Sequence, residues 1–274
     1  MLPSKKLSLI GVGRMGEALI KGFLQSGIIE AGQVLLSDIN VDRLEVLKGK
    51  YRVESTVDNR DAVKRGNIVL LAVKPQQMEG VLTGAKDAFH KELLVISIAA
   101  GVTTEKIYTV IGKEVPVIRV MPNTPALVGK GMSVVSRGKY ADDESAEVAL
   151  KLFSSIGEAV ELPEDLQNQA TAISGSGPAY FFLMVEALIE AAVKVGVDRG
   201  IAKKLVIQTM SGSATMLLET GKEPEELREM VTSPGGTTAA ALQVFSKREF
   251  RSIVQEAVGA AIKRAGELAQ LGGI

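Results

Sequence analysis

The sequence predicts an α/β fold in two domains, a doubly wound parallel sheet over residues 1–162 and an all-helical domain over residues 163–274. Three observations predict it. The chain has 274 residues, enough for two domains of about 100–200 residues each. Short apolar runs alternate with amphipathic stretches up to about residue 160, the pattern of strands joined by helices. Beyond Pro163 only long stretches rich in Ala, Leu, Met and Val follow.

The sheet is predicted from apolar runs of Val, Ile and Leu, as strands buried on both faces require. The runs are "LSLIGV", "VLLSD", "NIVLLAV", "LLVISIA", "VPVIRV", "MSVVS" and "EAVEL". Helix-like segments such as Gly16–Ser26 lie between several of them. This alternation favours parallel strands with connecting helices.

The second domain is predicted to be helical throughout. Asp198 is a candidate N-cap, Pro224 suits a first helical position, and Gly196 and Gly221 suit helix ends. Several helices, such as "PAYFFLMVEALIEAAVKV", are apolar nearly all round and must therefore be buried. They form either a compact bundle or, the interpretation we favour, an extensive homodimer interface with a second copy. The expected helices cover residues 164–173, 178–196, 198–220, 224–231, 237–246 and 249–271.

The composition narrows the function classes. Lys and Arg number 32, as do Asp and Glu, so no overall charge would attract nucleic acid or an anionic membrane surface. The absence of Cys excludes disulfides and a thiol nucleophile. The single His is His90, so a Ser-His-Asp triad or a metal site would have to be built around it, and we expect no metal.

The start of the chain predicts no targeting segment. "MLPSKKLSLIGVGRMG" runs directly into a strand and lacks the apolar core and cleavage site of a signal peptide. No stretch of about 18 uninterrupted apolar residues suggests a membrane span. We therefore expect a cytoplasmic protein with neither a membrane nor a nucleic-acid partner.

A Gly-rich turn in "LSLIGVGRMGEALIKGFLQSG" predicts a dinucleotide site. Gly11, Gly13 and Gly16 follow a strand and open a helix. Gly11 allows the tight turn, Gly13 lets the backbone approach a pyrophosphate, and Gly16 permits close packing of helix on strand. A Gly-rich turn without a ligand is the alternative. Strand, turn and helix together indicate a Rossmann-type domain.

Asp38 closes the second apolar run and bears on the choice of cofactor. An acidic side chain there bonds the adenosine ribose hydroxyls and repels a 2′-phosphate, which favours NADH. Ser37, Asn40 and Arg43 nearby could still accommodate the phosphate of NADPH. The choice between NADPH and NADH stays open.

Further candidates stand where later strands end, because ligands of doubly wound sheets bind outside the carboxyl ends of strands. Lys74 precedes Pro75, which stops a strand, and faces either the cofactor or solvent. "SIAAG" and "RVMPNTPALVGKG" end the next two strands. Asn123, held between two prolines, either reaches the nicotinamide or satisfies its own turn.

The candidate residues offer no strong acid, which hydride transfer to a ketone normally needs. His90 lies in the polar lead-in to a strand and is expected to be structural. The helix opening at "ISGSGPAY" lacks the Lys typical of hydroxyacid dehydrogenases of related build. A protonated C=N accepts a hydride without forming an oxyanion, so an imine is the better substrate. Another imine or ketone reductase, or a non-enzymatic dinucleotide sensor, is the alternative.

These motifs together resemble the pyrroline-5-carboxylate reductase family over essentially the whole chain. The most specific is "LREMVTSPGGTTAAAL" (Leu227–Leu242), which is close to that family's signature. The others are "GVGRMGEAL", "LAVKPQ", "AAGV", "VMPNTPALVGKG" and "SGSGPAY".

The resemblance implies an oxidoreductase that reduces (S)-1-pyrroline-5-carboxylate to L-proline with NADPH or NADH, the last step of proline biosynthesis. It implies a homodimer formed through the C-terminal helices and further assembly into a decamer of five dimers. One departure concerns the cofactor, because many members carry small or basic residues near Asp38.

The resemblance also implies site residues. The substrate loop comprises Ser233, Gly235, Gly236, Thr237 and Thr238, with the Thr238 hydroxyl beside the ring nitrogen as the catalytic candidate. An aliphatic hydroxyl is a poor acid near pH 7, so we expect Thr238 to orient the ring rather than donate a proton. The implied cofactor residues are Gly11, Val12, Gly13, Arg14, Met15, Gly16, Asn59, Ala72, Val73, Lys74, Pro75, Ala99, Ala100 and Asn123. Ser37 and Asp38 are cofactor candidates from their position at the end of the second apolar run.

Overall fold

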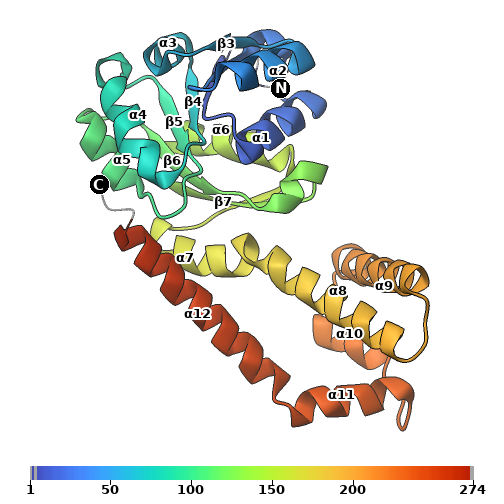
Figure 1. The fold of residues 1–274 in the computed structure, drawn as a ribbon. Helices are drawn as coiled ribbons and strands as arrows, with labels where there is room; N and C mark the ends of the chain where they lie inside the picture. Colours follow the sequence, from blue (N-terminus) through green and yellow to red (C-terminus); the bar gives the residue numbers. More distant parts are fainter. Residues whose placement is uncertain (1, 3–4, 272–274) are drawn as a thin grey trace. The chain divides into compact units, whose positions relative to one another are not determined.

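The computed structural model describes Leu2 and residues 5–271 (Figure 1). The chain forms two compact units, described separately below: Met1–Ser176 with Ala261–Ile274, and Gly177–Ala260. The helical segment that follows residue 163 thus begins within the first unit. The domain boundary expected between residues 162 and 163 stays a prediction.

The first unit contains an eight-stranded sheet in the order β3-β2-β1-β4-β5-β6-β7-β8. Its neighbouring strands are parallel, except that β7 runs antiparallel to β6. The order reverses between β1 and β4, which is the switch point where ligands of such sheets bind. The strands are β1 (Leu7–Ile10), β2 (Val34–Ser37), β3 (Glu54–Thr56), β4 (Ile68–Leu71), β5 (Leu94–Ser97), β6 (Val117–Met121), β7 (Gly131–Arg137) and β8 (Gly157–Glu161).

The α/β prediction is confirmed, with two differences. Strand β3 has the sequence "EST" and lies at the sheet edge, partly exposed, so no apolar run marked it. The antiparallel β7 follows a short turn, Thr124–Val128, rather than a crossover helix. A short connection favours an antiparallel neighbour.

Helices cover both faces of the sheet. On one face α1 (Arg14–Gln25), α2 (Val41–Tyr51) and α6 (Asp143–Ser154) contribute to one apolar cluster. On the other, α3 (Asn59–Arg65), α4 (Met78–Gly84) and α5 (Thr104–Ile111) contribute to a second. This double layer explains why the central strands are buried along their whole length.

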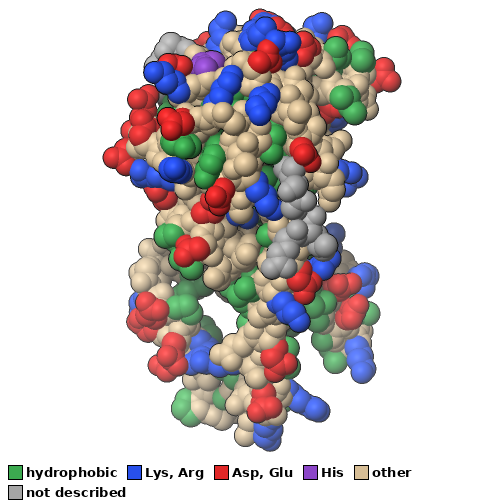
Figure 2. Space-filling model, turned by 90° about the vertical axis from the view of Figure 1, so that its left-hand side faces the viewer, with side chains coloured by type: hydrophobic (Ala, Val, Ile, Leu, Met, Phe, Trp, Pro, Cys, Tyr) green, Lys and Arg blue, Asp and Glu red, His purple; other side chains and the backbone are tan. Residues whose placement is uncertain are grey.

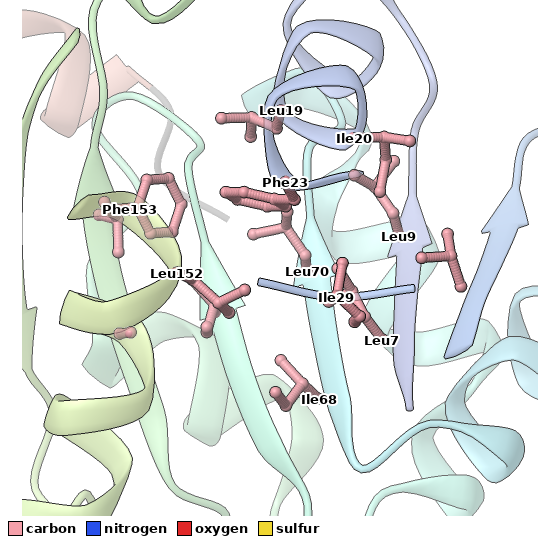
Figure 3. Packing of buried hydrophobic residues seen from close by; sticks show 14 of the residues in the cluster. Leu7, Leu9, Leu19, Ile20, Phe23, Ile29, Ile68, Leu70, Leu152 and Phe153 are labelled. Atoms are coloured by element: carbon pink, nitrogen blue, oxygen red, sulfur yellow. The ribbon is translucent and has the colours of Figure 1, made fainter. Parts of the chain in front are cut away.

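The first cluster is centred on two aromatic side chains. Phe23 of α1 and Phe153 of α6 meet edge to face, with ring centroids 5.7 Å apart and planes at 85°. Both are fully buried, and Figure 3 shows Phe153 to the left of Phe23, with Leu70 of β4 below Phe23. Such aromatic pairs stabilise by about 0.5–1.5 kcal/mol beyond the area they bury. The pair therefore fixes α1, whose N-terminus carries the Gly-rich turn.

The predicted helices of the C-terminal part are present. Asp198 caps α9, because its Oδ1 accepts from the Ile201 N–H at 3.0 Å. Gly221 ends α9 with a φ of +62°, and Pro224 opens α10. The helices are α7 (Gln167–Ala170), α8 (Gly177–Lys194), α9 (Arg199–Thr220), α10 (Pro224–Met230), α11 (Thr237–Lys247) and α12 (Phe250–Leu271). Where a break was expected after residue 173, a π-helical turn (Thr171–Gly175) leads directly into α8.

The helical unit exposes large apolar side chains. Phe181, Phe182 and Leu183 of α8 are 60, 63 and 65% exposed. Within the described residues, Glu164–Lys194 is long and apolar enough to cross a membrane by length and composition, yet only 17% of its most apolar window is buried. A helix whose apolar face is covered by a second subunit meets the same criteria.

A buried ion pair fastens the start of the helical segment to the sheet. Arg119 of β6 is only 5% exposed, and its Nη1 lies 3.4 Å from Glu164 Oε1. Thr104, which opens α5, donates to Glu164 twice, from its N–H at 2.9 Å and from its hydroxyl at 2.6 Å. Glu164 therefore joins β6 and α5.

We expect Glu164→Ala to lower the free energy of unfolding by about 3 kcal/mol, because it leaves the Arg119 guanidinium buried without its carboxylate. Urea denaturation measures this loss. Asp165→Ala is the matched control: Asp165 is an adjacent but exposed carboxylate, so a change within about 0.5 kcal/mol is expected. Equal losses for both variants would contradict the role given to the pair.

Candidate cofactor and substrate sites

The carboxyl ends of the parallel strands bring the predicted cofactor residues to one edge of the sheet. Parallel strands end on the same side, so segments distant in sequence meet there. Gly11–Gly16 follow β1, Ser37 and Asp38 end β2, Asn59 follows β3, Ala72–Pro75 follow β4, Ala99 and Ala100 follow β5, and Asn123 follows β6.

The three glycines of the turn have different surroundings. Gly11 has a φ of +94°, and an added Cβ would lie 2.8 Å from Val73 Cγ1. At Gly16 an added Cβ would lie 2.3 Å from the Gly11 carbonyl oxygen. At Gly13 nothing lies within 4 Å, and this residue is exposed. Gly11 and Gly16 are therefore required by the fold, whereas Gly13 leaves space for a ligand.

The N-terminus of α1 is suited to an anion. Gly13 is the N-cap and supplies no side-chain hydrogen bond to the first turn, whose N–H groups need acceptors from elsewhere. Gly13 and Arg14 are exposed, Met15 is half-buried, and Val12 and Gly16 are buried. A pyrophosphate fits this arrangement, because the N–H groups and the helix dipole both favour negative charge.

Asp38 is half-buried and supports the Gly-rich turn. Its Oδ2 accepts from the Val12 N–H at 2.8 Å and its Oδ1 from the Asn40 N–H at 3.0 Å. Beside it, the buried Ser37 hydroxyl donates to Asn59 Oδ1 at 2.8 Å. The structure thus brings these three predicted residues together at the ends of β2 and β3.

A residue that the sequence did not single out lies next to this group. Glu17, in α1, accepts hydrogen bonds from Arg43, Lys50 and Tyr51 of α2. An acidic residue in the first turn of a helix is common, because it complements the helix dipole, so the sequence position of Glu17 did not indicate these contacts. Of the three α2 residues that bond to Glu17, the sequence singled out only Arg43, as a residue that could accommodate the phosphate of NADPH.

The loops after β4 and β5 present mostly backbone groups and small side chains to a ligand. The Ala72 N–H donates to the Ile10 carbonyl at 2.8 Å, which ties the β4 end to β1. Val73 and Pro75 are half-buried and Lys74 is exposed. Ala99 is buried, while Ala100 is exposed. Small side chains here keep the edge open to a flat ligand.

Asn123 is 8% exposed and both ends of its amide are engaged within the protein. Its Nδ2 donates to the Ser174 carbonyl at 3.0 Å, and its Oδ1 accepts from the Met132 N–H at 2.9 Å. The Ser174 carbonyl belongs to the π-helical turn, in which the Ser176 N–H donates to the Thr171 carbonyl at 2.8 Å. The side chain thus satisfies the local backbone, and a direct cofactor contact stays a prediction.

His90 lies before β5, at the amino ends of the strands and away from the cofactor edge. Its side chain is 49% exposed, and its Nδ1 lies 3.1 Å from Glu92 Oε2. This position agrees with the structural role expected for it. In the part of the chain that the structure describes, no group of three or more His, Cys, Asp and Glu side chains could hold a metal ion.

The predicted substrate loop lies in the second unit, between α10 and α11. Gly236 N–H donates to the Ser233 carbonyl at 3.0 Å, and Gly235 has a φ of +70°. Pro followed by a left-handed Gly is the signature of a type II turn. An added Cβ at Gly236 would lie 2.4 Å from Ser233 Oγ, so a side chain at this position would require the Ser233 hydroxyl to move.

The turn delivers the chain into α11. Gly236 is its N-cap and provides no side-chain hydrogen bond, and Thr237 is its first residue. Thr237 is exposed and Thr238 half-buried. Helix α10 ends at Met230, four residues before Pro234, so the proline lies in the turn and is not what ends the helix. The loop thus presents the N–H groups of a helix N-terminus with hydroxyls beside them.

The Gly-rich turn, the acidic residue ending β2 and the switch point define the protein as a Rossmann-type enzyme of the dinucleotide-dependent class. Two family models match it: "NADP oxidoreductase coenzyme F420-dependent" over residues 6–101 and "Pyrroline-5-carboxylate reductase dimerisation" over residues 164–268. The chain belongs to the pyrroline-5-carboxylate reductase family. It is an NAD(P)H-dependent oxidoreductase and a homo-oligomer.

Full-length relatives show this membership. The chain is 40% identical to the pyrroline-5-carboxylate reductase of Methanosarcina acetivorans, over 97% of this chain and 99% of the relative. It is 36% identical to that of Escherichia coli, over 97% and 99%. Among solved structures, the pyrroline-5-carboxylate reductase of Coxiella burnetii has a TM-score of 0.92 at 36% identity, covering 97% of this chain and 98% of that one. The Plasmodium falciparum enzyme, solved with NADP bound, has a TM-score of 0.88 at 32% identity, covering 98% and 100%.

Proposed function

We propose that this chain carries out the reaction for which its family is named, the reduction of (S)-1-pyrroline-5-carboxylate to L-proline with NADPH or NADH. The observation that carries the proposal is the type II turn at Ser233–Gly236, which opens helix α11 in a chain that also has a dinucleotide edge. A turn of this kind at a helix N-terminus binds a carboxylate.

The substrate is held by the loop of Ser233, Gly235, Gly236, Thr237 and Thr238. Backbone N–H groups at the start of α11 bind its carboxylate, since they lack a side-chain cap. The Thr238 hydroxyl orients the ring nitrogen. This assignment needs no general acid, because a protonated imine is already electrophilic and its reduction gives an amine rather than an oxyanion.

The cofactor is held along the carboxyl edge of the sheet. The pyrophosphate binds at Gly11–Gly16, the adenosine ribose is bound by Asp38 and Asn59, and the nicotinamide end lies along Ala72–Pro75, Ala99, Ala100 and Asn123. When bound, the nicotinamide supplies the hydride that the imine carbon of the substrate accepts, and this carbon becomes C5 of proline. The ring nitrogen takes its proton from water or is protonated before it binds.

The proposed assembly is a homodimer that forms through the C-terminal helices. Five such dimers form a decamer in the cytoplasm. The exposed apolar side chains of α8 support a covering subunit, and the face shown in Figure 2 carries Lys and Arg interspersed with Asp and Glu. This mixed charge does not favour a nucleic-acid partner or an anionic membrane surface. Sedimentation is expected to give at least twice the 29.0 kDa of one chain at micromolar concentration. A stable species at the monomer mass would contradict the covered interface.

The experiment that tests the function compares substrates. Purified protein should oxidise NADPH or NADH when pyrroline-5-carboxylate is added and leave both unchanged with a 2-oxo acid of similar size. Oxidation with the ketone alone would favour another reductase of the same two-domain build. Binding of the cofactor without turnover of either compound would favour a dinucleotide sensor.

A further inference from the structure

Two cations of α2, Arg43 and Lys50, are paired within the protein close to the Gly-rich turn. Arg43 contacts the turn directly, since its Nε donates to the Val12 carbonyl at 3.1 Å. Asp38 accepts from the N–H of the same residue, Val12, at 2.8 Å. Asp38, whose carboxylate could bind the ribose hydroxyls, and Arg43, whose guanidinium could bind a 2′-phosphate, therefore both hydrogen-bond to Val12 of the Gly-rich turn. Asp38 binds its N–H and Arg43 binds its carbonyl.

Glu17 holds this guanidinium. The Glu17 Oε2 forms a short ion pair with Arg43 Nη2, and Oε1 accepts from Lys50 Nζ at 2.8 Å and from the Tyr51 hydroxyl at 3.0 Å. The Glu17 side chain is 21% exposed and that of Arg43 32%. One carboxylate thus binds two cations of α2 from its place in α1.

The local charge follows from these pairs. Arg43 and Lys50 bring two positive charges, which Glu17 and Asp38 offset with two negative ones. The hydrogen bond from Lys50, with help from Arg43 and Tyr51 and against a partial burial, lowers the pKa of Glu17 to about 2. Glu17 is therefore ionised at any pH near neutrality, and an incoming 2′-phosphate finds no unpaired cation among these four side chains.

We propose that Glu17 is a positioning residue that sets the cofactor preference of this chain toward NADH, by holding Arg43 in an ion pair that keeps its guanidinium from a 2′-phosphate. The proposal rests on the cofactor edge of the proposed function. NADH needs only the ribose contact that Asp38 supplies, whereas NADPH must compete with Glu17 for the Arg43 guanidinium.

The test measures equilibrium binding of NADH and NADPH by calorimetry in wild type, Glu17→Gln and Glu17→Gln/Arg43→Gln. Glu17→Gln keeps the shape but removes the charge, so it should shift the ratio of the two dissociation constants toward NADPH by about tenfold or more, a change of about 1.4 kcal/mol. The double variant should lose this gain, since the gain acts through Arg43. Glu45→Gln is the matched control, because Glu45 pairs with Lys48 on an exposed part of α2, and it should leave the ratio unchanged.

The outcomes separate this proposal from the function. A merely structural Glu17 would weaken both cofactors alike and leave their ratio unchanged, which would overturn the proposal while wild-type binding still supports the cofactor edge. A gain in NADPH binding that persists without Arg43 would overturn it as well. Failure of wild type to bind either cofactor would instead contradict the proposed function itself.

Discussion

Replacing Gly13 with alanine is expected to weaken dinucleotide binding by about a hundredfold or more, about 2.7 kcal/mol, while leaving the fold intact. The physical reason is the space above this residue: no protein atom lies within 4 Å of an added Cβ, so the methyl group meets the ligand and not the protein. A pyrophosphate that must approach the backbone at this position would be displaced. Calorimetric titration with NADH and NADPH measures the loss, and thermal melting checks the fold.

Two other glycines serve as comparisons. Gly16→Ala should lower the melting temperature as well, because its Cβ would lie 2.3 Å from the Gly11 carbonyl oxygen. Gly80→Ala, in α4, meets nothing within 4 Å and lies outside the proposed site, so it should leave binding unchanged and, because alanine favours the helix over glycine, not lower the melting temperature. Undiminished binding by a folded Gly13→Ala protein would show that the pyrophosphate is not bound at this turn.

Removing the Thr238 hydroxyl is expected to lower kcat/KM for pyrroline-5-carboxylate about tenfold or more, about 1.4 kcal/mol of transition-state stabilisation. The hydroxyl stands in the first turn of α11, beside the N–H groups proposed to bind the carboxylate. Thr238→Ala keeps those N–H groups and removes only the group that orients the ring. Steady-state kinetics at saturating cofactor measures the effect.

Thr238→Ser is the matched variant, because it retains the hydroxyl and loses only a methyl group. It should keep most of the wild-type kcat/KM. If the alanine variant is as active as wild type, Thr238 has no part in the reaction. If the serine and alanine variants lose the same amount, the methyl group and not the hydroxyl is what matters, and the orienting role fails.

The sequence was most informative where backbone geometry requires one residue type. Gly11 and Gly16 were predicted from their spacing, and both lie where an added Cβ would collide with backbone or side-chain atoms. "SPGG" lies between two predicted helices, 224–231 and 237–246, and the structure shows a left-handed Gly235 there before the N-cap Gly236. The steric reasons for such residues are local, so they can be read without a structure.

Features that depend on distant partners could not be predicted. The Asn123 side chain bonds to Ser174, which is 51 residues away in sequence, and the hydrogen bonds of Glu17 reach across to α2. Strand β3 was not predicted, because its sequence is polar and its strand conformation depends on pairing with β2. In each case the missing information was the identity of the partner, which only the assembled sheet supplies.

The central claim is that the chain reduces the carbon–nitrogen double bond of pyrroline-5-carboxylate. The most direct measurement uses NADPH or NADH carrying deuterium at C4 of the nicotinamide, on the face that is transferred, with analysis of the product by NMR and mass spectrometry. The expected product is L-proline with one deuterium, located at C5. Each cofactor is tested with deuterium on either face of C4. Proline that carries no deuterium with either labelled form, or deuterium at another carbon, would contradict this reaction. The absence of proline with both NADPH and NADH would contradict it as well.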